Sequence, residues 1–302
     1  MPAGEQRMNG DPNEFAKQMK MLVNNKDLND IQFLIGPGRK KVYAHRCILS
    51  GRCEIFRAMF VDHTQKNGPI EKDVPFVLSD MGYDVFLTML EFIYTNCVTL
   101  SSKTAIDVMA TALEYGLDDL KTLCEEYLVS TLDTNNACDR IQAAQTYRLE
   151  DLKRKTLEYI EANTKSVFES KGFEELAEDT LCSILDSDQL QLDELEIYKA
   201  VRRWANMNAV VAGKKIEDMA RNAVKRVRFP LLSLDELGTL EQENRKDHFV
   251  PMESFALAWK LHATKQGEKG NPLTTRRAGT APRDSHRFLD NEPTSGQHKH
   301  KA

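Results

Sequence analysis

The chain has 302 residues, of which 41% are hydrophobic and 29% are charged, and its formal net charge at pH 7 is −5. These values are typical of a globular protein with room for two domains, and the negative charge argues against nucleic acid as the main partner. The N-terminus has no apolar signal segment, and no stretch approaches the run of about eighteen apolar residues that spans a membrane, so we expect neither secretion nor a membrane span.

The cysteines form no CxxC pair and no Cys/His cluster with the spacing of zinc ligands. We therefore expect reduced thiols in a cytoplasmic or nuclear protein, with no metal and no cofactor. The six are Cys47, Cys53, Cys97, Cys124, Cys138 and Cys182.

An amphipathic helix is predicted at the start of the chain. Asp11 suits the N-cap, and Pro12 suits the first helical position. Phe15, Met19 and Leu22 then recur at helical spacing. Taken as a bare pattern, this apolar stripe most often faces the core of its own domain.

Strands and helices alternate in the next part of the chain. Apolar residues alternate at 31–35 and again at 42–44, and Gly36-Pro37-Gly38 separates the two runs, which predicts a β-hairpin. PFVLSD and CVTL are predicted to be short strands. Helical periods occupy HRCILSGRCEIFRAMF and DVFLTMLEFIYTN.

From there to about residue 230 the pattern is helical, and one unit occurs twice at an offset of thirty-two residues. The turns YGLDDL and YRLEDL each join two helices, which predicts two helical hairpins. A solenoid is the alternative, but a solenoid needs about three stacked units and the register is lost after the second. The matching pairs are Tyr115 and Tyr147, Leu117 and Leu149, Leu120 and Leu152, and Tyr127 and Tyr159.

The C-terminal part is divided by composition. Pro230 would interrupt a helix, and PMESFALAWKLHATK has a last apolar period. Beyond Lys265 the chain is rich in Gly, Pro and charge, and we expect it to be disordered unless bound.

Several of these segments together resemble known domains. LNDIQF, VYAHRCILSGRCEIFRAMF, LEFIYTNCVTL and ALEYGLDDLKTLCEEYL resemble a BTB/POZ domain, and the stretch from LDTNNACDRIQAAQTYRLEDL to VRFPLLSLDEL resembles a BACK domain. The implied fold is an α+β BTB/POZ domain with a small sheet and helical hairpins, followed by an all-α BACK domain. The expected boundaries are a flexible N-terminus at 1–10, BTB/POZ at 11–132, BACK at 133–240, a helical extension at 241–264 and a disordered tail at 265–302.

The resemblance implies a protein-interaction platform, commonly a homodimer and in many members an adaptor of a cullin-3 ubiquitin ligase. The first helix, through Phe15, Met19 and Leu22, matches the helix that packs across the two-fold axis of such dimers. Asp30 and Arg46 match a charged pair near that interface. The alternative for this pair is a buried ion pair that fixes the core.

One departure from the family weakens the cullin interpretation. Cullin-binding members usually carry a hydrophobic-x-Glu element after the helix that ends here at Phe60, whereas this chain has VDHTQKNGPI. Losing an apolar anchor removes roughly 1.5–3 kcal/mol of burial. A helical hairpin at 133–160, similar to the so-called 3-box, is a possible compensation. The candidate cullin-facing residues are Phe60, Val61, His63 and Tyr94.

Three other features have a functional and an ordinary interpretation. His45 is a candidate base, but it has no neighbouring nucleophile, so we expect a hydrogen-bonded core histidine. The LKRK run at 152–155 is a candidate docking patch, but the acidic residues beside it favour a solvated, salt-bridged helix face. HKHK near the C-terminus holds two histidines without fixed geometry, which does not predict a metal site.

The tail segment RRAGTAPRDSHRFLD contains apolar residues in a polar stretch, which is compatible with a short docking motif or with unused disordered sequence. The candidate motif residues are Arg283, His286, Phe288 and Leu289.

No known catalytic motif is present: the chain has no GxGxxG after a strand, no P-loop, no GxSxG, no HExxH and no CxxC. We therefore expect a non-catalytic scaffold. Two versions remain open, a cullin-3 adaptor that holds an unknown client, and an oligomerising or corepressor-type module without cullin contact.

Overall fold

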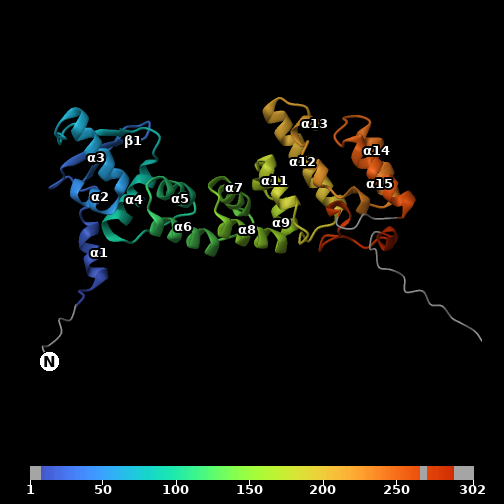
Figure 1. Cartoon of the computed structure of the whole chain (residues 1–302), viewed down its shortest axis with the longest axis horizontal. Helices are drawn as coiled ribbons and strands as arrows, with labels where there is room; N and C mark the ends of the chain where they lie inside the picture. Colours follow the sequence, from blue (N-terminus) through green and yellow to red (C-terminus); the bar gives the residue numbers. More distant parts are fainter. Residues whose placement is uncertain (1–7, 266–270, 289–302) are drawn as a thin grey trace, which may run out of the picture. The chain divides into compact units, whose positions relative to one another are not determined.

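The computed structural model describes residues 8–265 and 271–288, which divide into two compact units, residues 1–131 and 132–302 (Figure 1). Each unit is described separately below. The first contains the only strands among the described residues. Its elements are α1 (Pro12–Lys20), β1 (Ile31–Ile35), β2 (Lys40–Ala44), α2 (Arg46–Arg52), α3 (Glu54–Asn67), β3 (Phe76–Leu78), α4 (Tyr83–Thr95), α5 (Ala105–Glu114) and α6 (Asp118–Ser130).

The sheet of the first unit has the order β2-β1-β3. β1 and β2 form the predicted hairpin, with Phe33 opposite Val42 in antiparallel register. β3 pairs with β1 in parallel, with Leu34 beside Val77, which the local pattern did not predict. The chain between β1 and β3 contains β2, α2 and α3, and the two helices make the crossover that a parallel pair requires.

An aromatic cluster forms the centre of this unit. The Phe33 ring lies 5.8 Å from Phe56 and 5.2 Å from Phe86, measured between ring centroids. All three side chains are fully buried. Tilted and edge contacts of this kind add to the free energy of burial. The alternation predicted at 31–35 therefore marks the strand that the helices cover.

The predicted strand CVTL is wrong, because residues 97–100 have no regular structure. Asn96 adopts a left-handed conformation with φ of 59°, which ends α4. The Thr95 hydroxyl then bonds both the amide and the carbonyl of Cys97, each at 3.0 Å. A side chain thus takes the backbone groups that a neighbouring strand would otherwise bond.

The repeated sequence unit forms two hairpins with the same turn. In the first copy of the repeat, Leu117 donates its backbone N–H to the Ala112 carbonyl at 2.8 Å. In the second copy, Leu149 donates its backbone N–H to the Ala144 carbonyl at 2.9 Å. Positive φ occurs at the same place in both turns, at Gly116 and Arg148. The predicted hairpins are confirmed. The two helices that directly follow the second copy have five and four residues, so the hairpin does not occur a third time in succession and the solenoid alternative is wrong.

The second unit contains helices and short 3-10 turns. Its apolar core is drawn from residues between 137 and 258, with Trp204 at its centre donating Nε1–H to the Leu176 carbonyl at 2.9 Å. Its elements are α7 (Ala137–Tyr147), α8 (Glu150–Ala162), α9 (Thr164–Phe168), α10 (Lys171–Glu174), α11 (Glu178–Leu185), α12 (Glu194–Ala212), α13 (Ile216–Met219), η1 (Val224–Arg226), η2 (Phe229–Leu231), α14 (Leu234–Asn244), α15 (Met252–Thr264), η3 (Pro272–Thr274) and η4 (Asp284–Phe288).

A core substitution in the second unit can be followed selectively, since both tryptophans of the chain, Trp204 and Trp259, belong to it. Phe173 is fully buried, with its ring 4.4 Å from that of Phe168. We expect Phe173→Ala to lower the free energy of unfolding by about 3–5 kcal/mol, because it removes apolar contacts and leaves a cavity. Urea unfolding monitored by tryptophan fluorescence measures this change.

The control is Val210→Ala on α12, where the valine is exposed. We expect its effect to stay within about 0.5 kcal/mol. Equal midpoints for the two variants would contradict the placement of Phe173 in the core.

Candidate functional site

The start of the first unit presents apolar side chains to solvent. Phe15 is 60% exposed and Leu28 is 86% exposed, and Met8 and Met21 are exposed as well. Met19 and Leu22 are half-buried, and α1 buries none of its residues completely although it packs against α4. An amphipathic helix is stabilised by burying its apolar face, so partial burial of this face contributes little stability. This surface is therefore incompletely covered within one chain.

Asp30 and Arg46 form an ion pair, with Arg46 Nε 3.1 Å from Asp30 Oδ2. The other Asp30 oxygen accepts the Arg46 backbone N–H at 2.8 Å, at the start of α2. Both side chains are about 40% exposed, so the pair is not the buried one considered as an alternative. A pair at such exposure adds only about 0–1 kcal/mol of stability.

A hollow of about 520 Å³ lies beside this ion pair. Its apolar wall is built mainly by α3 and the segment after it, through Phe60, Val61 and Ile70. Asp30 and Arg46 supply charge at its edge. The hollow thus combines an apolar wall with a few polar groups, which is the usual composition of a small ligand or peptide site.

The candidate cullin-facing residues differ in exposure. Phe60 is buried against Phe76, with ring centroids 5.7 Å apart. Tyr94 is buried too, and burial raises the pKa of its hydroxyl. Val61 is 51% exposed and His63 is half-buried. Only the last two can meet a partner without rearrangement of the core.

His45 has the structural role that was expected of it. Its Nδ1 lies 3.0 Å from the Tyr94 hydroxyl, which also accepts the His45 backbone N–H at 2.8 Å. The imidazole is nearly buried. The prediction of a hydrogen-bonded core histidine is confirmed.

The LKRK run at 152–155 is salt-bridged as predicted, with Arg154 2.6 Å from Asp151 and 2.9 Å from Glu158.

Residues 271–288, called the clasp from here on, hold defined positions on the second unit, which differs from the expected disordered tail. Their anchoring is polar. Within residues 271–287, Arg277 and His286 are the buried residues, and the apolar core of the unit takes no residue from this range. Composition did not predict this, because Gly, Pro and charge indicate too little apolar surface to fold, whereas the clasp is held by charged contacts instead.

Arg277 is the central anchor of the clasp. Its side chain is 0% exposed, as is that of Glu194 at the start of α12, and Arg277 Nε lies 3.0 Å from Glu194 Oε2. The guanidinium also donates to the carbonyls of Leu185 at 2.6 Å and Arg226 at 3.1 Å, and to that of Ser187. Burial lowers the pKa of Arg277 and Glu194 opposes this shift. All three nitrogens of the guanidinium thus meet acceptors, through four hydrogen bonds.

The backbone of the clasp is held close beside the chain between α11 and α12. Ala278 donates its N–H to the Asp188 carbonyl at 2.9 Å, and Gly279 donates to the Leu190 carbonyl at 3.0 Å. A Cβ atom at Gly279 would lie 2.0 Å from the Leu192 backbone nitrogen. The approach therefore requires glycine at this position.

Arg283 makes the second charged anchor. It bonds both carboxylate oxygens of Asp193, at 3.0 and 2.8 Å, and both of Glu236, at 2.9 and 3.0 Å. Burial disfavours the charge of Asp193, but the bonds from Arg283 and from the Ala281 amide outweigh it and lower its pKa to about 2. Bidentate guanidinium–carboxylate pairs are among the strongest hydrogen-bonded contacts.

The other candidate tail residues lie at the end of the clasp. His286 is buried, with Nε2 2.8 Å from the Leu231 carbonyl. Phe288 is the last residue of η4. Leu289 and the HKHK run lie outside the described residues. Two of the residues that anchor the clasp, Arg283 and His286, were predicted as candidate motif residues. Arg277 was missed because a single arginine carries no periodic signal.

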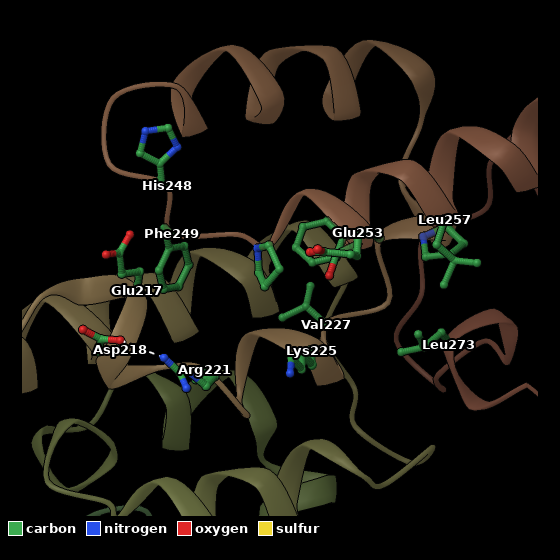
Figure 2. A pocket seen from close by; sticks show the side chains of 14 residues that line it. Glu217, Asp218, Arg221, Lys225, Val227, His248, Phe249, Glu253, Leu257 and Leu273 are labelled. Carbon is green, nitrogen blue, oxygen red and sulfur yellow. Dashed lines mark hydrogen bonds and ion pairs between the residues drawn. The ribbon is translucent and has the colours of Figure 1, made fainter.

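A groove of about 760 Å³ lies next to the clasp, between α13, η2 and α15 (Figure 2). Its floor contains Val227 and Phe249, and Asp218 pairs with Arg221 at 3.0 Å on one side. Figure 2 shows Glu217 toward one end of the groove, and Leu273 of the clasp at the other end, below Leu257. The clasp thus supplies part of the wall.

No group of three or more His, Cys, Asp or Glu side chains that could hold a metal ion occurs within residues 8–265 and 271–288. In the same residues, no helix has the length and apolar character to cross a membrane. All six cysteines are free thiols, and two of them, Cys47 and Cys97, are exposed.

Comparison with known proteins shows the family. The model of the BTB/POZ domain matches residues 19–132, and that of the domain described as "BTB And C-terminal Kelch" matches residues 137–242. The chain is 41% identical over 285 residues to "BTB/POZ domain-containing protein 19" of Bos taurus, and equally to that of Homo sapiens, covering 94% of this chain and 96% of each relative. The chain belongs to the BTB/POZ-BACK family.

A more distant relative supports the same assignment. "BTB/POZ domain-containing protein 9" of Homo sapiens is 29% identical over 225 residues, which cover 74% of this chain and 35% of that protein. The predicted fold class, an α+β BTB/POZ domain followed by an all-α BACK domain, is confirmed. These domains are those of a protein-interaction adaptor, and their families are generally non-catalytic scaffolds.

The anchor of the clasp predicts a large effect at one glutamate. We expect Glu194→Ala to lower the free energy of unfolding of the second unit by about 3–5 kcal/mol, because it leaves the buried Arg277 without its counter-charge. Tryptophan fluorescence during urea unfolding is the measurement. Glu196→Ala is the matched control on the same helix, since Glu196 is half-exposed and pairs only with Lys199 in the hydrogen bonds of its side chain that are described.

We expect the control to change stability by less than about 1 kcal/mol. Similar losses from the two variants would show that the pair of Glu194 and Arg277 is not the anchor.

Proposed function

We propose that the protein is a non-catalytic homodimeric scaffold that joins a protein client to cullin-3. The observation that carries the proposal is the apolar surface around α1, with Phe15, Met21 and Leu28 exposed together in a BTB/POZ unit. Such a surface on one chain marks a contact with another chain. A second copy covers it, with Met19 and Leu22 at the edge of the contact and the pair of Asp30 and Arg46 near it.

Support for cullin binding comes from both units. Three valines are exposed in this part of the chain: Val61 in α3, Val74 just before β3, and Val77 in β3. They offer apolar surface in place of the missing hydrophobic-x-Glu element. The hairpin of α7 and α8 corresponds to the 3-box suggested by the sequence. We place the protein in the cytoplasm or nucleus, where cullin-3 ligases act, with no role for nucleic acid or membrane.

The second candidate function is an oligomerising or corepressor-type module without cullin contact. The hollow beside Asp30 and Arg46 favours it, because its wall and its charged edge suit a peptide. The two functions share the dimer and differ in whether cullin-3 binds.

Dimerisation predicts a mass of twice that of the 34.4 kDa chain in size-exclusion chromatography with light scattering. We expect Phe15→Asp combined with Met21→Asp to give monomers, because two carboxylates would be buried without partners in the interface. The control combines Val210→Asp with Val211→Asp on α12, where both valines are exposed in the other unit. A wild-type protein that stays monomeric at micromolar concentration would refute the dimer.

Cullin binding is tested by titrating the full chain with the N-terminal domain of cullin-3 in a calorimeter. We expect a complex, and we expect Val61→Asp to weaken it by about tenfold or more, because the substitution places a charge in an apolar contact. Val210→Asp is the control and should leave affinity unchanged. The absence of a complex at concentrations of about tens of micromolar would favour the second candidate function.

A further inference from the structure

The site under the clasp has the features of a peptide-binding site rather than of a domain core. The core of the second unit takes none of its residues from positions 271–287 of the clasp. Contact is made through a buried arginine, a bidentate arginine and backbone hydrogen bonds. Extended peptides are commonly recognised in this way, with main-chain bonds for affinity and side-chain pockets for specificity.

The pocket for Arg277, called the arginine slot from here on, selects a guanidinium. Its acceptors are the Glu194 carboxylate and the carbonyls of Leu185, Ser187 and Arg226, and they engage all three nitrogens of the side chain. A planar guanidinium offers five donors in a fixed fork, whereas a lysine ammonium is a single point with three donors. Lysine therefore leaves acceptors of the slot without partners.

The buried carboxylate of Glu194 requires a positively charged partner in the arginine slot. Glu194 is 0% exposed, and its other oxygen accepts the Arg228 backbone N–H at 2.6 Å. With a segment in place of the clasp that lacks an arginine at this position, the carboxylate would stay covered but lose its counter-charge, which is costly. Any segment that replaces the clasp must therefore supply an arginine of its own.

Three further positions complete the pattern that the site recognises. A glycine is required two residues after the arginine, because of the approach of Gly279 to Leu192. A second arginine six residues after the first meets Asp193 and Glu236, as Arg283 does. An apolar residue four before the first arginine lies at the end of the groove, as Leu273 does in Figure 2.

We propose that this strip of the BACK unit is a binding site for a partner protein segment with the pattern Leu-x3-Arg-x-Gly-x3-Arg, and that the clasp is its resident ligand. The partner segment displaces the clasp and continues along the groove beside Leu257. The site is in the second unit, so its test is separate from those of dimerisation and cullin binding.

The test uses the full chain and a fluorescein-labelled peptide of residues 271–287. In full-length Arg277→Ala the slot is empty, and we expect the peptide to bind at least about tenfold more tightly than to the wild type, whose own clasp competes. Peptides with Arg277→Lys or Gly279→Val should lose at least about tenfold in affinity. The control protein is Thr275→Ala, since Thr275 is exposed and its hydroxyl bonds the Asn271 carbonyl within the clasp, and it should bind the peptide no better than the wild type does.

Two further measurements decide the matter if Arg277→Ala does not fold, as judged by circular dichroism. Full-length Arg283→Ala keeps the slot filled but loses the second anchor, so it should also bind the peptide more tightly than the wild type. In the wild-type protein, excess peptide should raise hydrogen exchange in residues 275–283 as the clasp is displaced.

Three results would overturn the proposal. Equal binding of the lysine peptide would show that the slot does not select arginine. Failure of both variants to bind the peptide, with unchanged exchange in the wild type at about 1 mM peptide, would make the clasp a fixed structural element. Exchange in residues 275–283 that depends on protein concentration without added peptide would show that a second copy supplies the segment.

Discussion

The architecture of the second unit depends on a carboxylate that has no contact with solvent. Glu194 sits at the start of α12, accepts a backbone N–H from Arg228 and pairs with the guanidinium of Arg277. The free energy of an isolated buried charge is prohibitive, so these partners are needed together. One side chain thereby ties the central helix, the turn before η2 and the clasp to each other. Asp193, the residue before Glu194, likewise pairs with an arginine of the clasp, Arg283, closer to the surface of the unit.

The first unit depends on apolar packing instead, and its pattern was largely predictable. Alternation at 31–35 gave the buried strand and its hairpin, and helical periods gave most of the helices, because these signals come from residues near each other in sequence. The parallel partner of β1 is set by a contact across α2 and α3, which no local window contains. Residues 97–100 do not form a strand, and the Thr95 hydroxyl bonds both backbone groups of Cys97 at the start of this segment.

Candidate functional sites were harder to predict than helices and strands. The family resemblance named Phe60 and Tyr94 as cullin-facing, but a resemblance does not indicate exposure, and both are buried. It gave the pair of Asp30 and Arg46, whose ion pair is formed. Arg277 and Glu194 were not singled out, because they are far apart in sequence and each is ordinary in its own surroundings. The signal that was present is the doublet at 276–277 followed by a small residue and a glycine, which becomes informative only beside a buried acid.

The position of Arg277 affects the expected consequence of truncating the chain. The matches to the BTB/POZ and BACK domain models stop at residue 242. A premature stop codon after that point therefore leaves both matched ranges complete. A stop between residues 243 and 258 also removes part of the apolar core, and any stop before residue 277 removes the counter-charge of Glu194. Protein quality control would respond to that defect, and a variant scored as benign from domain coverage would be lost by degradation.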